Sequence, residues 1–123
     1  MSDLFAPAGG WRVRILDLSG GARDNIIEEI GGFDTLMHAN AFACRYVRDS
    51  VERCRAPAMT SKDVLEAWFA FGEDAVVIAA GEGAWKSATE LGDFVDTRAS
   101  EEDRDWRSLD PRRDDPDLDE EDE

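Results

Sequence analysis

Histidine occurs once in this chain, at position 38, so any reaction that needs an imidazole must use that residue. A serine nucleophile paired with His38 would need a turn that presents it, and the chain contains no Gly-x-Ser-x-Gly sequence. A tetrahedral zinc site would need further ligands, but Cys44 and Cys54 are the only cysteines and lie far apart on the same predicted helix. We therefore expect His38 to be a solvated helix residue.

The two cysteines can be tested for a disulfide by geometry. Cys44 and Cys54 are ten residues apart on one predicted helix, which separates them by about 15 Å at a rise of about 1.5 Å per residue. A disulfide needs Cα atoms within about 7 Å, so the two cannot bond to each other. We expect both thiols to be reduced and to pack as small apolar side chains at the edge of the core. An intermolecular or redox role is the alternative.

Two segments match ligand-binding motifs only in part. Residues 81–87 place Lys-Ser before a predicted helix, as in a phosphate-binding loop, but Trp85 stands where that loop requires its second glycine. The aspartates at alternate positions from Asp115 to Asp119 have the spacing that opens an EF-hand calcium loop. The sixth position of that loop must be glycine and is Glu120 here. We therefore expect no cofactor and no metal site.

Adjacent carboxylates could in principle carry out acid–base chemistry. Glu28 precedes Glu29, and Glu73 precedes Asp74, but a chain with 29 acidic residues contains such neighbours by chance. An enzyme would need several carboxylates to meet His38 in one cleft. We expect a protein without catalysis, and an enzyme of unknown class remains the third alternative.

Acidic residues outnumber basic ones by 29 to 14, which gives a net charge of -15. From Asp110 onward there are nine acidic and two basic residues, a net charge of -7, which leaves -8 for the rest of the chain. Such a chain repels phosphate backbones, so we expect no direct binding to nucleic acid. A protein with a basic surface is the expected partner.

One long helix is expected to position the candidate binding residues. The stretch from Phe33 to Arg55 has continuous helical periodicity, with Asp34 as the expected N-cap and Pro57 as the stop. The outer face of this helix carries three pairs of opposite charges at i, i+4 spacing, which are Arg45 with Asp49, Arg48 with Glu52, and Asp49 with Arg53. Phe42 is predicted at the edge of this polar face.

A second candidate binding element follows residue 99, where Trp106 and Leu109 are the larger apolar residues of a highly charged segment. Either Trp106 folds back onto the domain, or the segment becomes ordered when it binds a partner. The residues predicted to contact a partner are Phe42, Arg45, Arg48, Asp49, Trp106 and Leu109.

The remaining elements predict an α+β fold. Residues 11–18 alternate as a half-buried strand, and residues 75–81 are typical of a buried strand. Residues 24–33 fit either a strand that pairs with the first one or a helix that begins at Asp24. Short helices are expected from Thr60, which begins a capping box with Asp63, and from Ser87 to about Thr97. Gly72 is expected to end the first of these, and the residues between 67 and 72 fit either helix or strand.

These elements predict a small two-layer domain, with an antiparallel sheet of three to four strands covered by one long and two short helices. We expect a flexible lead-in over residues 1–10, one domain over 11–99, and a charged, disordered acidic tail over 100–123. The predicted core residues are Trp11, Val13, Ile15, Leu36, Val47, Val51, Val76, Ile78, Leu91 and Phe94.

The sequence shows neither a membrane-spanning apolar run nor a signal peptide, which predicts a cytoplasmic protein. The ratio of 12 arginines to 2 lysines indicates a bacterial genome rich in GC. The predicted function is that of a small binding or regulatory protein that engages a protein partner through its long helix and acidic tail. The alternative is an acidic mimic of nucleic acid that inhibits a basic protein.

Overall fold

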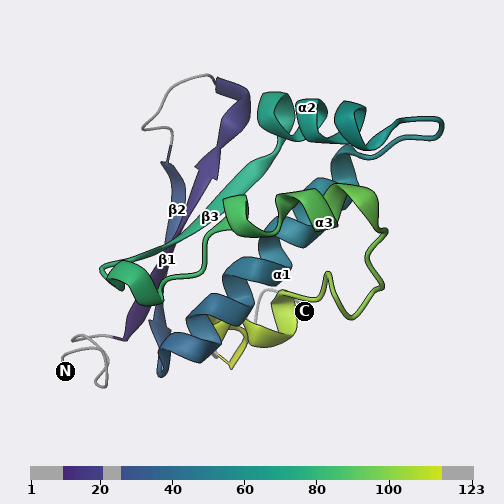
Figure 1. Ribbon diagram of the computed structural model, residues 1–123. Coiled ribbons are helices and arrows are strands. Elements are labelled where there is room, and N and C mark those ends of the chain that lie inside the picture. Colours follow the sequence, from purple (N-terminus) through teal and green to yellow (C-terminus); the bar gives the residue numbers. More distant parts are fainter. Residues whose placement is uncertain (1–9, 21–25, 115–123) are drawn as a thin grey trace.

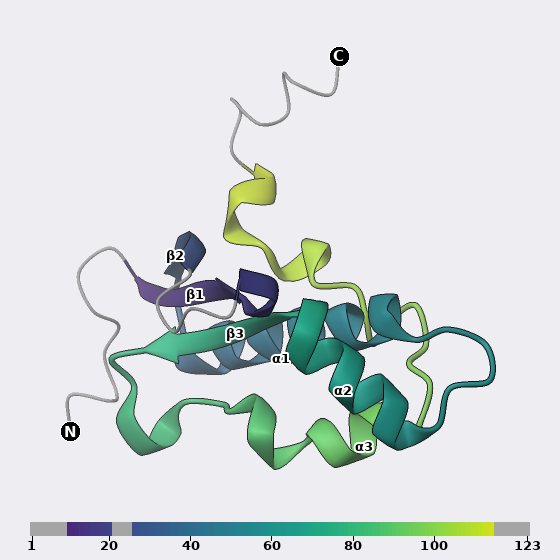
Figure 2. The same ribbon diagram turned by 90° about the horizontal axis from the view of Figure 1, so that it is seen from above.

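The computed structural model describes residues 10–20 and 26–114. The strands are β1 (Trp11–Asp17), β2 (Ile26–Phe33) and β3 (Glu73–Ile78), and the helices are α1 (Leu36–Cys54), α2 (Ser61–Phe71) and α3 (Leu91–Asp96). The strands form one antiparallel sheet in the order β2-β1-β3, and α1 runs along one face of it (Figures 1 and 2). The predicted α+β class, with three strands under one long and two shorter helices, is confirmed.

The central strand β1 alternates as expected, because its apolar side chains face α1. Val13 and Ile15 pair with Ile30 and Glu28 of β2, and both β1 residues are fully buried. Of the two interpretations of residues 24–33, the strand is correct from Ile26 onward. Residues 24 and 25 and most of the predicted lead-in lie outside the described residues.

Helix α1 begins one residue later than expected. The N-cap is Thr35, whose Oγ1 accepts a hydrogen bond from the His38 backbone N–H at 3.0 Å. Asp34 lies one position too early for this contact, since the capping side chain belongs to the residue that directly precedes the helix. The helix ends at Cys54, before Pro57, as predicted.

Helix α2 has the predicted capping box, in which the side chains of Thr60 and Asp63 each bond to the other residue's backbone N–H at 3.1 Å. The helix runs to Phe71, so residues 67–71 are helical and not extended, and Gly72 is the C-cap. A Cβ atom at Gly72 would lie 2.3 Å from Cδ1 of Trp68, so only glycine fits there. The chain therefore turns tightly over the Trp68 ring before β3 begins.

Three predicted core positions are wrong. Strand β3 turns Ala75 and Val77 toward α1, so Val76 is 37% exposed and Ile78 is only partly buried. The prediction placed the wrong alternate residues inward, and a shift of one residue exchanges the two faces of a strand. Leu36 also packs only partly against the core.

The capping box expected at Ser87 is absent from the described chain. Residues Ser87–Thr89 form a 3-10 turn, and α3 starts later, after Glu90. Ser87 is instead buried, with its side chain hydrogen-bonded to the Asp74 carboxyl. The Ser87 side chain therefore bonds to Asp74, which is distant in sequence, and not to the neighbouring Glu90 as expected.

The packed chain extends to residue 114, beyond the domain end expected at residue 99. Ser100 and Asp103 cap a turn with two reciprocal hydrogen bonds of 3.1 Å. Two 3-10 turns follow, Arg107–Leu109 and Pro111–Asp114, and they contact α1 and β2. This segment and α3 lie on opposite sides of α1 (Figures 1 and 2). The rest of the predicted acidic tail, residues 115–123, lies outside the described residues.

Candidate interaction surface on helix α1

A linear segment from the C-terminal part of the chain lies across α1. We call residues 104–112 the strap. Its contacts run from Asp49, in the second half of α1, through Tyr46 and Phe42 to His38 near the start of the helix. The strap therefore covers one side of the helix that the sequence predicted to be exposed.

Asp49 is the charged centre of this contact. Only 8% of the residue is exposed, and each of its carboxylate oxygens accepts a hydrogen bond from the strap. Arg104 Nε donates to Oδ1 at 2.8 Å, and Trp106 Nε1 donates to Oδ2 at 3.2 Å. A buried carboxylate is costly unless it is paired and hydrogen-bonded. Within α1 only Arg53 pairs with Asp49, at 3.6 Å, and the strap adds the two shorter contacts.

The Trp106 ring packs on two aromatic side chains of α1. Its centroid lies 4.9 Å from that of Tyr46 and 5.8 Å from that of Phe42, where the two rings meet edge to face. The guanidinium carbon of Arg107 lies 4.4 Å from the centroid of the same indole. Aromatic pairs and cation–π contacts of this kind add to the energy of apolar burial.

The far end of the strap is held by His38. Its Nε2 lies 2.6 Å from the Leu109 carbonyl oxygen, and a carbonyl can only accept, so Nε2 carries the proton. The His38 ring is also edge-on to Phe33, with centroids 5.0 Å apart. The expectation of a solvated histidine is therefore wrong, because the strap covers it.

Arg112 fastens the strap to the sheet. It forms ion pairs with Glu28 of β2 and, at 2.7 Å, with Asp110. Hydrogen bonds to Asp110 and Glu28 raise the pKa of Arg112 above its usual value. This contact joins the last described turn to the edge strand of the sheet.

The structure brings together four of the six predicted binding residues, namely Phe42, Asp49, Trp106 and Leu109, but not on a free surface. Phe42 is fully buried, which corrects its placement at the edge of a polar face. The strap covers the side of the helix that sequence periodicity assigned to solvent.

The other two predicted residues also turn to the chain itself. Arg45 donates to the Asp105 carbonyl at 3.1 Å, and Arg48 donates to the Thr97 carbonyl at 3.2 Å. The Arg48 guanidinium also lies over the Phe94 ring, 4.8 Å from its centroid. Arg45 therefore holds the strap itself, and Arg48 holds the chain that leads from α3 to the strap.

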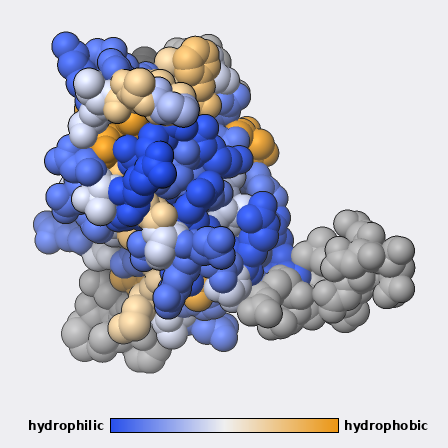
Figure 3. All heavy atoms as spheres, turned by 90° about the vertical axis from the view of Figure 1, so that its right-hand side faces the viewer, coloured by the Kyte–Doolittle hydropathy of each residue, from blue (hydrophilic) through white to orange (hydrophobic). Residues whose placement is uncertain are grey.

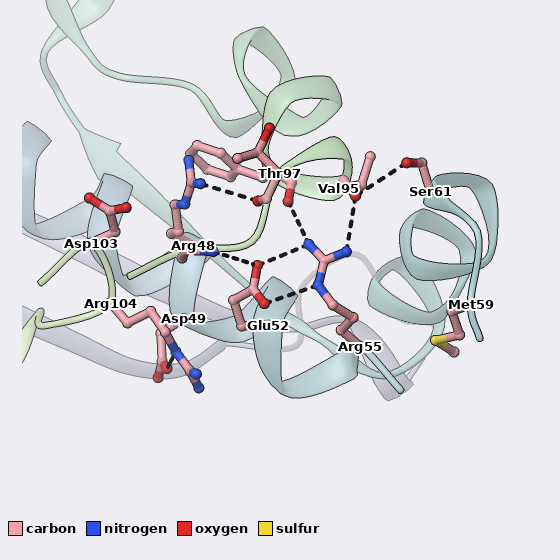
Figure 4. Close-up of polar contacts among 12 residues, drawn as sticks. Arg48, Asp49, Glu52, Arg55, Met59, Ser61, Val95, Thr97, Asp103 and Arg104 are labelled. Carbon is pink, nitrogen blue, oxygen red and sulfur yellow. Dashed lines mark hydrogen bonds and ion pairs between the residues drawn. The ribbon is translucent and has the colours of Figure 1, made fainter. Parts of the chain in front are cut away.

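Of the three expected i, i+4 pairs, the described residues form one, between Asp49 and Arg53 at 3.6 Å. Glu52 pairs instead with Arg55, which the sequence analysis did not single out. Arg55 donates to both carboxylate oxygens, at 2.9 and 3.0 Å, and to the carbonyls of Phe94 and Val95 at 2.9 and 3.1 Å. We call this group, drawn in Figure 4, the clamp.

The clamp attaches α3 to the end of α1. Arginine side chains can satisfy the free carbonyls of a helix's last turn, and here the helix is α3 while the arginine caps α1. The Ala99 backbone N–H also donates to Glu52 at 3.2 Å. The only signal in the sequence is an arginine three residues after a glutamate, and nothing local identifies the distant carbonyls.

A separate hollow of about 410 Å³ opens between the ends of α1 and α2. Its apolar lining includes Cys54, Met59 and the exposed Phe71, and Arg53 and Glu73 lie at its polar side.

Burial raises the pKa of the Cys54 thiol, and burial also raises the pKa of the Cys44 thiol to about 11. Both thiols therefore remain protonated at neutral pH and are weak nucleophiles.

Much of the remaining surface is polar. The side on the right of Figure 1, with the α1–α2 connection and the chain after α3, is mainly hydrophilic (Figure 3). Within residues 10–20 and 26–114, no three acidic, histidine or cysteine side chains are grouped so that they could hold a metal ion. None of the helices in the described part of the chain is long and apolar enough to cross a membrane.

The sequence matches no protein-family model, and comparisons with curated proteins and with solved structures give no significant match.

Proposed function

We propose that this is a small binding or regulatory protein without catalysis, which engages a protein partner through α1 and its acidic C-terminal residues. One observation carries the proposal: α1 already binds a linear segment, the strap, mainly through side chains. A helix that offers an aromatic surface and a buried carboxylate to one linear segment has the features of a peptide-binding surface.

The charge of the chain defines the expected partner. The net charge of -15 favours a partner with a basic surface and disfavours nucleic acid itself. The seven acidic residues between positions 115 and 123 begin three positions after the end of the strap. They would increase the rate of encounter with a basic partner bound at α1.

Two further features support this proposal. The described thiols are both free, as in proteins of the reducing cytoplasm, where we place the protein. The raised pKa values of Cys44 and Cys54 also disfavour a cysteine nucleophile.

Affinity capture with a charge-neutralised variant tests the proposal. The variant replaces the seven acids from Asp115 to Glu123 by their amides, so that the chain length is unchanged. We expect partner proteins retained by the wild type to be lost from the variant, and to be released as salt rises from about 0.05 to about 0.5 M because exposed charges are then screened. Quantitative mass spectrometry measures the retained proteins.

A control variant neutralises three acids that are exposed on the folded part, Glu66, Glu82 and Asp93. This control should retain the partners. An identical set of proteins on wild type and on the tail variant would contradict the proposal. If nucleic acid displaces the captured partner, the alternative of an acidic nucleic-acid mimic is supported instead.

A further inference from the structure

We infer that the side of α1 beneath the strap is a recognition site for a partner segment that carries arginine and tryptophan two residues apart. The strap is then an internal occupant that the partner must displace. We call Phe42, Tyr46 and Asp49 the receptor face. The inference rests on the proposed function, because it specifies what the α1 surface recognises.

The receptor face follows from helix geometry. Phe42, Tyr46 and Asp49 are spaced i, i+4 and i+7, so they form one stripe along α1. Two aromatic rings therefore form a floor that ends in a carboxylate. Tyr46 is fixed in this floor by a hydrogen bond of 2.5 Å from its hydroxyl to Glu73.

The chemistry of this face selects its ligand. An indole fills the aromatic floor and also has an N–H that reaches Asp49, whereas a phenylalanine ring would have no donor. A guanidinium supplies a second, charge-assisted donor to the same carboxylate. Lysine is a poorer substitute, because it is a strongly hydrated point charge without a planar set of donors.

The strap is held in a way that permits exchange. The domain binds the strap backbone through side chains, with Arg45 on the Asp105 carbonyl and His38 on the Leu109 carbonyl. The Arg104 side chain remains 37% exposed. A partner segment with the same two side chains could make the same contacts, and it competes only with the effective concentration of the tethered strap, which is of millimolar order for short links.

A peptide supplied in trans tests this inference on the full-length protein. The probe is a fluorescein-labelled peptide with the sequence of residues 102–112, and fluorescence anisotropy measures its binding. We expect a chain with Arg104→Ala and Trp106→Ala to bind the peptide at least tenfold more tightly than the wild type, because its own strap no longer competes. Adding Asp49→Asn to that chain should reduce binding at least tenfold.

A peptide with alanine in place of both the arginine and the tryptophan is the matched control and should bind neither chain. If the double variant loses its helical circular dichroism, the single variant Arg104→Ala, which keeps Trp106, replaces it in the same titration. Equal binding by wild type and variant, or no effect of Asp49→Asn, would overturn the inference. Dimers of the wild type in sedimentation at the titration concentration would overturn it too, since the occupant would then be a second copy's strap.

Failure of this inference can be distinguished from failure of the proposed function. If the peptide does not bind but capture still depends on the acidic residues 115–123, the receptor face is wrong and the proposed function stands. If the peptide binds but capture shows no such dependence, the role of the acidic residues in the proposed function is wrong.

Discussion

Two carboxylates on α1, three residues apart, each bind an arginine, but with different consequences. Glu52 pairs with Arg55 of the same helix end, and both side chains are nearly buried, at 7% and 13% exposure. Asp49 pairs with Arg104, which is 55 residues away in sequence and has a more open side chain. The Glu52–Arg55 ion pair is local and nearly buried, while the Asp49–Arg104 ion pair joins distant residues and is partly open on the side of Arg104.

The partners differ as well. The clamp arginine reaches backbone carbonyls of α3, which cannot move without that helix. The strap contacts on Asp49 come from the side chains of Arg104 and Trp106. A buried pair joined to backbone is expensive to break, whereas a pair with one partly exposed member, here Arg104, is weaker and more sensitive to salt. The comparison indicates that the clamp maintains the fold and that the strap can be released.

The largest expected effect is that of Glu52→Ala. It would leave the Arg55 guanidinium buried without its carboxylate, and the loss of one partner of such a pair costs about 3 kcal/mol of unfolding free energy. Urea denaturation followed by circular dichroism measures the loss. Glu66→Ala, on the exposed side of α2, is the control and should change little. A loss below about 1 kcal/mol would remove the distinction between clamp and strap.

Trp106→Ala should have a smaller effect, about 2 kcal/mol, because the indole is only half buried. The change should also be local. Hydrogen exchange is expected to accelerate in residues 104–112 and to remain unchanged in α3. Faster exchange throughout α3 would mean that the strap, like the clamp, supports the whole fold.

Asp49→Asn should cost about 1 kcal/mol, since it preserves shape and one acceptor but removes the charge that Arg104 and Trp106 share. The wild type should lose part of this difference as salt rises, because Arg104 is partly exposed. Denaturation of both proteins at low and high salt is the measurement. A difference independent of salt would argue against a charge contribution.

At neutral pH the smallest expected effect is that of Cys44, on the side of α1 nearer to Glu90 and Asp103, because its thiol is then protonated in both the folded and the unfolded chain. Burial raises its thiol pKa from 9.0 to about 11, so the unfolded chain releases this proton first. The free energy of unfolding should therefore fall as pH rises between those two values.

Alkylation of Cys44 at pH 8 should be at least tenfold slower in the folded protein than in the unfolded chain. Trp106→Ala should leave this rate unchanged, whereas Glu52→Ala should increase it.

Local patterns in the sequence predicted most of the fold. Alternation identified β1, periodicity identified α1, and the spacing of Thr60 and Asp63 identified the start of α2. Each of these features depends on residues within a few positions of one another, so the chain itself contains the information.

The candidate site could be predicted only in part. Periodicity assigned the strap side of α1 to solvent, because nothing near Phe42 indicates that Trp106 will cover it. The burial of Ser87 against Asp74 and the face of β3 depend in the same way on distant partners. Trp106 itself was recognisable as an apolar residue in a charged segment, although its docking site was not.

The sheet order has a consequence for synthesis of the protein. The central strand β1 is made first, but its second neighbour β3 starts at Glu73, 56 residues after Asp17 (73 minus 17). At about 5 to 20 residues per second, β1 waits about 3 to 11 seconds on the ribosome with one edge unpaired. Helix α1 emerges in that interval, and its aromatic stripe stays uncovered for longer, until Trp106 has been added. The growing chain thus passes through a stage in which the receptor face is open to any partner that can reach it.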